Sequence, residues 1–290
     1  MKSSNFAYCR PTSLAEVFDV FEHYGDDALI LAGGQSLLPT LNMRLSNPSV
    51  LIDINRVIEL QGVVEEGQYL KIGALTRHYE VESSSIVEKH VPLLHMAMPY
   101  VAHTAIRSRG TFGGSLAFAD AAAEIPAITL TCEAIIQVHS KQGNRQIAVT
   151  DFFQGLYSTA LQKGEIITRV LFPKNEFTHH VFKEFARRQG DYATVGIAIV
   201  AKFHLKQLQN IRIVYFGVSD RPIADVQLAQ DVLAQDFNAQ SIYQLSNRVG
   251  HDLEITTDIY HDRQTKHHLL KVIVKRALLE LLGKVEDGVS

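Results

Sequence analysis

Two glycine-rich segments lie about eighty residues apart in this chain of 290 residues. Residues 32–36 read Ala-Gly-Gly-Gln-Ser, and residues 110–115 read Gly-Thr-Phe-Gly-Gly-Ser. Because glycine has no Cβ, its backbone approaches phosphate oxygens closely and turns successive N–H groups toward one anion. Neither segment contains Gly-x-Gly-x-x-Gly or Gly-Lys-Ser/Thr, the signatures of Rossmann and P-loop sites. One glycine pair alone usually marks an ordinary turn, whereas two pairs flanked by hydroxyl side chains favour a diphosphate held from two sides.

The first part of the chain has the alternation of a small α/β unit. Ser13 and Glu16 have capping-box spacing at the start of a helically spaced apolar run. Short apolar strands are predicted at residues 28–31 and 50–54, with a helix at residues 37–45 between them. The first glycine segment therefore follows a strand directly and precedes a helix.

From about residue 55 the pattern changes to a mixture of strands and helices. The predicted elements are a strand at 69–73, helices at 76–90 and 92–101, a hairpin spanning 133–150 and a strand at 165–172. We therefore expect one domain over residues 1–174, with subdomains at about 1–55 and 56–174.

A second domain is predicted over residues 175–290, because residues 174–178 are polar and follow a proline. Three strand-like segments come next, at 181–188, 195–205 and 211–218, and a short polar turn between the second and the third favours an antiparallel meander. The remainder is predicted to be helical. Its clearest helix covers residues 264–282 and is expected to end at Gly283.

Charge and composition exclude several classes of protein. The chain has 28 Lys and Arg against 31 Asp and Glu, a net charge of -3, so no nucleic-acid partner is expected. Residues 1–10 lack the pattern of a signal peptide, and no apolar run approaches the roughly 18 residues of a membrane helix. We expect a cytoplasmic protein without a membrane span.

No metal site and no catalytic side chain of its own are predicted. Cys9 and Cys132 are too few for an iron–sulfur cluster, which needs about four protein ligands, and are expected to be reduced thiols. The adjacent histidine pairs, at 179–180 and 267–268, do not face one ligand on a strand or helix. There is no Ser–His–Asp or Cys–His arrangement of the kind that supports nucleophilic catalysis.

Several motifs together resemble one known family, the FAD-binding medium subunits of molybdenum hydroxylases of the xanthine dehydrogenase and carbon monoxide dehydrogenase type. Residues 32–39 (Ala-Gly-Gly-Gln-Ser-Leu-Leu-Pro) resemble the first FAD diphosphate loop, and residues 107–117 (Arg-Ser-Arg-Gly-Thr-Phe-Gly-Gly-Ser-Leu-Ala) resemble the second. Residues 119–126 continue the match, and residues 182–193 carry it into the second domain. The resemblance covers nearly the whole chain with the family's order and spacing.

This resemblance implies an α+β fold. Its FAD-binding part would be a two-subdomain fold of the vanillyl-alcohol oxidase type. A C-terminal domain of a three-stranded antiparallel sheet plus a helical bundle would follow.

The resemblance also implies which residues contact FAD. Glu124 matches an acidic position beside the cofactor, Lys183 a lysine near the polar edge of the flavin ring, and Tyr192 an aromatic residue that covers one face of the ring. A cation at the polar edge would stabilise negative charge on reduced flavin. The full expected set is Ala32, Gly33, Gly34, Gln35, Ser36, Leu37, Thr111, Gly113, Gly114, Ser115, Ala119, Glu124, Ile167, Lys183 and Tyr192.

Two positions depart from the family pattern. Ser115 stands where many relatives have Asn, and Ala121 stands where proline is common, but neither change removes a hydrogen-bond donor. Covalent flavoproteins of the wider fold often have His at the first glycine loop, whereas this chain has Gln35. We therefore expect FAD to be held without a covalent bond.

The resemblance implies an electron-transfer subunit. FAD would receive electrons from iron–sulfur clusters on another chain and pass them to an external acceptor. The implied partners are a large molybdopterin-binding subunit and a small subunit with two [2Fe-2S] clusters, assembled as a heterotrimer. A self-sufficient flavin-dependent oxidase or reductase of the same fold is the alternative, and a nucleotide-binding scaffold without redox activity is a third.

Overall fold

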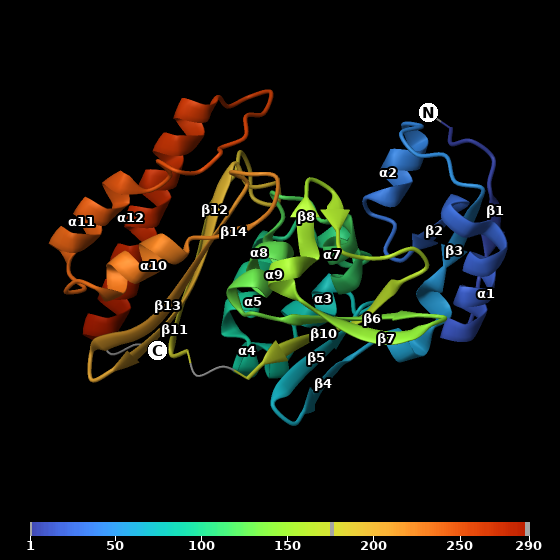
Figure 1. Ribbon diagram of the computed structural model, residues 1–290, viewed down its shortest axis with the longest axis horizontal. Coiled ribbons are helices and arrows are strands. Elements are labelled where there is room, and N and C mark those ends of the chain that lie inside the picture. The colour runs from blue at the N-terminus through green and yellow to red at the C-terminus, as the bar shows by residue number, and fades with distance from the viewer. Residues whose placement is uncertain (1, 175–176, 288–290) are drawn as a thin grey trace.

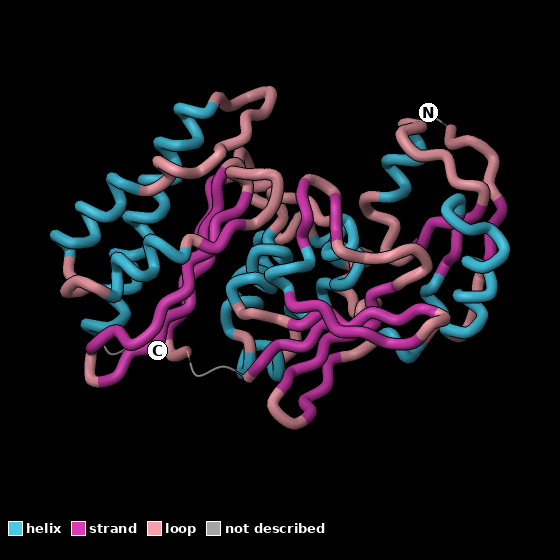
Figure 2. Tube along the Cα trace, in the orientation of Figure 1, coloured by secondary structure: helices cyan, strands magenta, loops and turns pink. Residues whose placement is uncertain are grey.

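The computed structural model describes residues 2–174 and 177–287. Figure 1 shows three units side by side along the longest axis: a small N-terminal sheet, a central sheet with helices, and a C-terminal sheet covered by helices. Figure 2 shows that the long strands belong to the central and C-terminal units, whereas those of the N-terminal unit are short. The mixture of helices with largely antiparallel sheets makes this an α+β fold, as predicted.

The N-terminal unit is a three-stranded parallel sheet with strand order β1-β3-β2. The Ser13 hydroxyl caps its first helix by accepting a 3.3 Å hydrogen bond from the Glu16 N–H, as the capping-box spacing predicts. The second helix ends earlier than predicted, because Arg44 adopts a positive φ of 59° and leaves the helical conformation. The elements are β1 (Ala7–Cys9), α1 (Leu14–Tyr24), η1 (Gly25–Asp27), β2 (Ala28–Leu31), α2 (Leu37–Asn42), β3 (Val50–Asp53), η2 (Ile54–Arg56) and η3 (Ile58–Leu60).

The central unit contains a five-stranded sheet with strand order β4-β5-β10-β6-β7. The strands are β4 (Val63–Glu66), β5 (Tyr69–Gly73), β6 (Ile135–Ser140), β7 (Gly143–Ala148) and β10 (Ile166–Pro173). All four pairings are antiparallel, and the β6–β7 pair is the hairpin that the sequence predicts. A separate two-stranded sheet joins β8 (Phe153–Gly155) to β9 (Ser158–Thr159).

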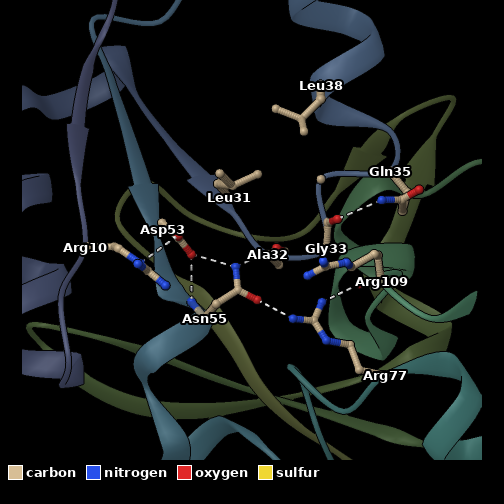
Figure 3. Close-up of a pocket in the computed structure, with 11 residues that line it drawn as sticks. Arg10, Leu31, Ala32, Gly33, Gln35, Leu38, Asp53, Asn55, Arg77 and Arg109 are labelled. Carbon is tan, nitrogen blue, oxygen red and sulfur yellow. Dashed lines mark hydrogen bonds and ion pairs between the residues drawn. The ribbon is translucent and has the colours of Figure 1, made fainter. Parts of the chain in front are cut away.

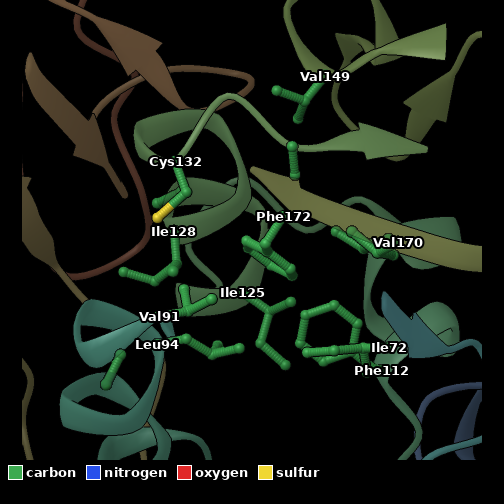
Figure 4. Packing of buried hydrophobic residues seen from close by; sticks show 14 of the residues in the cluster. Ile72, Val91, Leu94, Phe112, Ile125, Ile128, Cys132, Val149, Val170 and Phe172 are labelled. Carbon is green, nitrogen blue, oxygen red and sulfur yellow. The ribbon is translucent and has the colours of Figure 1, made fainter. Parts of the chain in front are cut away.

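Short helices cover one side of the central sheet. The helix predicted over residues 76–90 is two helices, because Ser84 begins a new one by accepting a hydrogen bond from the Val87 N–H. The helices are α3 (His78–Glu82), α4 (Ser85–His90), α5 (Pro92–Ala97), η4 (Met98–Tyr100), α6 (Thr104–Arg107), α7 (Phe112–Phe118), α8 (Glu124–Thr131) and α9 (Val149–Phe152). Figure 4 shows the core between these helices and the sheet, where the rings of Phe112 and Phe172 lie 5.9 Å apart.

The C-terminal unit has a four-stranded antiparallel sheet with order β11-β12-β13-β14, so the prediction of three strands is wrong by one. The missed strand has only two residues, too few to show any alternation of polar and apolar side chains. Its elements are β11 (His179–Phe185), β12 (Val195–His204), β13 (Gln207–Phe216), β14 (Ile223–Ala224), α10 (Val226–Leu233), α11 (Ala239–Arg248) and α12 (Arg263–Asp287).

Helix α12 passes through Gly283 instead of ending there. The apolar face continues beyond this glycine, since Leu281 and Val285 are both buried. Burial of that face therefore outweighs the weak helix propensity of glycine.

The C-terminal sheet lies between the central unit and the C-terminal helices. One face contributes Phe182, Ala198 and Phe216 to the same hydrophobic cluster as the core of the central unit. The other face contributes Val181, Ile197 and Tyr215 to a cluster with α10, α11 and α12. Because side chains alternate along a strand, neighbouring residues of β11 point to different units.

Both cysteines are free. In residues 2–174 and 177–287, no helix combines the length and apolar character needed to cross a membrane. Within the same ranges, no group of His, Cys, Asp and Glu side chains is arranged to hold a metal ion. The predicted domain boundary at residues 174–178 includes residues 175–176, which lie outside the described residues.

Candidate functional site

The two glycine segments touch each other backbone to backbone. A Cβ built on Gly33 would lie 2.4 Å from the Arg109 carbonyl oxygen and 2.9 Å from the Gly110 Cα. Both distances are far shorter than a normal van der Waals contact, so only glycine fits between the segments at this point. The first segment follows the end of strand β2, and the second begins in the loop that leads into α7. The fold places these two loops next to each other.

A cavity of about 500 Å³ opens beside this contact, and we call it the larger cavity. Its walls come from both glycine segments, from the start of α8 and from the loop after β11, and so from all three units. Such a volume lies within the usual range for small-molecule sites, which is about 300–1,000 Å³. The expected residues that line it are Ala32, Gly33, Gly34, Gln35, Ser36, Leu37, Thr111, Gly114, Ser115, Glu124 and Tyr192.

The larger cavity contains donors that the chain itself leaves unused. Thr111 is 2% exposed, and in the described part of the chain its buried Oγ1 has no hydrogen-bond partner. Thr111 is the N-cap residue of helix α7, but its hydroxyl accepts no capping hydrogen bond from the backbone of the helix. In that same part, the backbone N–H groups of Gly34, Gln35 and Ser36 donate no hydrogen bond. The buried, unpaired Thr111 hydroxyl is costly, and the N–H groups of residues 34–36 are free to donate beside it, so this cradle suits an anion that accepts from them.

One end of the larger cavity carries carboxyl groups and phenols. Glu124 is 4% exposed, and burial, together with the nearby charge of Asp120, raises its pKa to about 7. Tyr157 donates a 3.4 Å hydrogen bond to Asp120. Burial and the neighbouring Asp120 raise the pKa of Tyr192, so its phenol stays protonated. This end of the cavity therefore offers neutral O–H groups near neutral pH.

Three of the expected residues serve the protein core and do not line the cavity. The Gly113 N–H donates a 2.8 Å bond to the Ala74 carbonyl, and a Cβ on Gly113 would lie 2.5 Å from the Ala74 Cβ. Ala119 ends α7 in the left-handed conformation and is 3% exposed. Ile167 lies in the central hydrophobic cluster. In this structure Gly113, Ala119 and Ile167 pack in the interior of the protein.

Lys183 also lies away from the larger cavity. It points from β11 toward α12 and forms an ion pair with Glu280 on that helix. The next residue, Glu184, points to the opposite face, where burial and the charge of Glu124 raise its pKa to about 8. Within the described residues, the buried Glu184 Oε2 has no hydrogen-bond partner. The strand register thus turns a carboxyl, not the predicted ammonium, toward the central unit.

The sequence pattern did not identify His78, which also lines the larger cavity. Its Nε2 lies 3.0 Å from the Thr111 carbonyl oxygen, and burial lowers its pKa to about 4, so the ring is neutral. A lone histidine gives no sequence signal, because only the pairing of residues 76–78 with the second glycine segment brings it here. Asp120 and Asp191 also line the cavity, and both lie within the segments that resemble the flavin-subunit family.

Two family descriptions match most of the chain. Residues 4–175 match the FAD binding domain in molybdopterin dehydrogenase, and residues 180–281 match the CO dehydrogenase flavoprotein C-terminal domain. The chain is 32% identical over 281 residues to the glyceraldehyde dehydrogenase medium chain of Sulfolobus acidocaldarius, and the match covers 97% of this chain and 100% of that protein.

Two solved structures are similar along the whole length. Quinoline 2-oxidoreductase from Pseudomonas putida superposes with a TM-score of 0.94 at 36% identity, covering 98% of this chain and 99% of that one. Carbon monoxide dehydrogenase from Hydrogenophaga pseudoflava, in a form lacking the Mo-pyranopterin moiety, gives a TM-score of 0.93 at 32% identity, with 98% and 99% covered.

Proposed function

Because the chain belongs to the FAD-binding medium subunits of the molybdenum hydroxylases, of the carbon monoxide dehydrogenase and xanthine dehydrogenase type, we propose that its larger cavity holds FAD. The protein is thus an oxidoreductase, the flavin subunit of a molybdenum hydroxylase complex. The FAD diphosphate would lie between residues 32–36 and residues 111–115. The observation that carries this proposal is the unpartnered Thr111 Oγ1 in a cavity whose walls are both glycine segments.

The residues of the larger cavity fit the parts of FAD. Unused N–H groups at Gly34, Gln35 and Ser36 suit the diphosphate, which accepts hydrogen bonds but donates none. Tyr192 is 57% exposed at the cavity wall, and there it would cover a face of the ring and exclude water. Glu124 holds a proton near neutral pH and would donate a hydrogen bond to an acceptor atom of the cofactor.

FAD supplies a ring that takes up one or two electrons. Within this chain, the described cavity residues bind and orient that ring, and we assign none of them a covalent role. Gln35 supports a non-covalent complex, because its amide is not a nucleophile and donates a 3.1 Å hydrogen bond to the Gly33 carbonyl. Ala119, Gly113 and Ile167 would act by holding the cavity walls in place.

We further propose that electrons arrive from iron–sulfur clusters of a partner and leave to an external acceptor. Similar proteins are named medium chains or medium subunits, which supports an assembly with at least one larger and one smaller chain. The partners would be a large molybdopterin-binding subunit and a small subunit with two [2Fe-2S] clusters. In this proposal residues 1–174 have the vanillyl-alcohol oxidase type fold, residues 175–290 form a second domain, and the chain is the flavin-bearing part of a heterotrimer.

The test is Thr111→Val, which replaces the unpartnered hydroxyl by a methyl group of the same shape. Because that hydroxyl makes no bond within the described residues, the variant should fold normally. Losing one hydrogen bond to the diphosphate should weaken FAD binding by about tenfold. FAD affinity is measured by reconstituting the purified FAD-free chain and following flavin absorbance. Thr257→Val, an exposed threonine of the C-terminal unit, is the matched control.

Two outcomes separate this proposal from its alternatives. If Thr111→Val holds FAD as tightly as the unaltered chain does, the diphosphate site is wrongly placed. If the isolated, FAD-loaded chain oxidises small alcohols or amines without partners, it is a self-sufficient flavin enzyme. A chain that binds no flavin reducible by dithionite would instead be a scaffold without redox activity.

A further inference from the structure

A second cavity of about 320 Å³ borders the first glycine segment, and we call it the arginine cavity. Residues 32–35 line both cavities, whereas the other residues of the arginine cavity do not line the larger cavity. Among the described residues, three arginines (Arg10, Arg77 and Arg109) and one acidic residue (Asp53) line the arginine cavity. Three positive charges against one negative charge leave a net charge of +2. Figure 3 shows these four side chains around the cavity.

Asp53 is paired chiefly with Arg10 and offsets the charge of Arg77 only in part. Its carboxylate lies 3.2 Å from the Arg10 Nε, and it accepts hydrogen bonds from the Tyr8 hydroxyl and from the Asn55 backbone N–H at 3.0 Å. Arg10 therefore compensates the charge of Asp53. The excess positive charge therefore lies mainly on Arg109 and on Arg77, which the carboxylates of Glu80 and Asp53 offset in part.

Arg77 is held in place by neutral acceptors. Its Nη2 donates a 2.5 Å hydrogen bond to the Asn55 Oδ1, and its Nη1 donates to the Arg109 carbonyl oxygen. In the described part of the chain, the Arg109 guanidinium takes part in no hydrogen bond or ion pair. Burial, and then the charge of Arg109, lowers the pKa of Arg77. Two like charges are therefore positioned close enough to repel each other.

Repelling cations beside a cavity are stabilised by an anion between them. Guanidinium groups present paired N–H donors that match the oxygens of a phosphate, and two of them match the charge of a phosphate dianion. Leu31 and Leu38 add an apolar wall to the same cavity.

We propose that the arginine cavity binds a phosphate group through Arg77 and Arg109, at a site separate from the one that holds FAD. The phosphate comes either from free phosphate or from a phosphorylated small molecule such as a nucleotide, whose organic part would lie against Leu31 and Leu38. This site goes beyond the flavin function, because its ligand is a second molecule that binds while FAD is present.

The experiment titrates inorganic phosphate, and separately AMP, into the FAD-loaded full chain in an isothermal calorimeter. We expect saturable binding with one site per chain. Tighter binding of AMP identifies a phosphorylated organic molecule as the ligand class, whereas equal or weaker binding identifies free phosphate. Arg109→Gln should weaken the binding by about tenfold, since it removes one charge-assisted donor pair. Arg263→Gln makes the same charge change at an exposed position of α12 and should have no effect.

Three results would overturn the proposal. The first is absence of saturable binding to the unaltered chain, and the second is an Arg109→Gln variant that binds phosphate normally. The third is phosphate binding that FAD displaces, which would assign these arginines to the flavin diphosphate instead. Flavin absorbance is recorded in every sample, so a failure of FAD binding is seen separately from a failure of phosphate binding.

Discussion

Glu124 carries a carboxyl group into the larger cavity at the first position of α8. Burial raises its pKa from the ordinary 4.5 to about 7, so the folded chain keeps this proton to a higher pH than the unfolded chain does. The free energy of unfolding therefore falls as pH rises through this window, because the charged form is disfavoured only in the folded state.

Glu124→Gln should remove this pH dependence. The variant should gain stability relative to the unaltered chain as pH rises from 4.5 to 7, by at most about 3 kcal/mol. Urea unfolding of the FAD-free chain at pH 5 and pH 8 measures the difference, with the exposed Glu254→Gln as control. An equal change at both pH values would show that the Glu124 carboxyl is not titrating in this window.

Glycine has two different uses at the site. Gly34 has a φ of +72°, so valine there would strain the backbone whether or not FAD binds next to it. Gly33 has no room for a Cβ because the second segment's backbone lies against it. Substitution of either glycine would therefore confuse loss of the fold with loss of the ligand, which is why Thr111→Val is the sharper test.

At the scale of elements, the alternation of side chains along strand β11 determines whether each of them faces the central unit or the C-terminal helices. Lys183 faces α12 and pairs with Glu280, which also lies 3.0 Å from the Lys284 Nζ. Glu184 faces the central unit. A shift of one residue in register would exchange these two roles.

Lys183→Met should therefore leave the reduction potential of bound FAD unchanged, and should change the free energy of unfolding by about 1 kcal/mol or less, as for other partly exposed ion pairs. Glu184→Gln changes a side chain on the opposite face, outside the lining of the larger cavity, whose charge acts on the cavity residue Glu124. It should therefore alter how FAD affinity varies between pH 7 and pH 9, because the Glu184 pKa is raised to about 8. Redox titration and FAD titration measure the two effects. A lowered flavin reduction potential in Lys183→Met would instead support a place for this lysine near the polar edge of the flavin ring.

At the scale of the whole molecule, the larger cavity depends on all three units. Gly190, Asp191 and Tyr192 reach it from the C-terminal unit. The same unit buries Phe182 and Phe216 in the core that it shares with the central unit. The C-terminal sheet therefore completes both the cavity wall and the core beneath it.

A chain truncated to residues 1–174 should bind FAD more weakly than the full chain and should aggregate, because it exposes the apolar surface that this sheet covers. Co-expression of residues 175–290 should restore both properties. Size-exclusion chromatography and flavin content measure the outcome. A monomeric fragment 1–174 with full FAD affinity would mean that the C-terminal unit is not part of the site.

Much of the local chemistry of this protein follows from its amino-acid sequence alone. Glycine pairs and hydroxyls give the same backbone freedom and donors in any fold, so residues 32–36 and 111–115 could be identified from their composition and spacing. Alternating and helical spacings reflect burial of one face, which predicted most long strands and α12. The two-residue strand β14 and the end of α12 were missed, because neither leaves a local pattern.

The tertiary structure, in contrast, determines which side chains contact one another at the site. Gly113 packs against Ala74, and Lys183 pairs with Glu280 and so points away from the cavity. In both cases the partner is distant in the sequence, so the contact leaves no local pattern. The arginine cavity exists only because Arg77 and Arg109 come from different loops that fold against one strand end. Local residue chemistry fixes what a side chain can do, whereas long-range packing fixes what it faces.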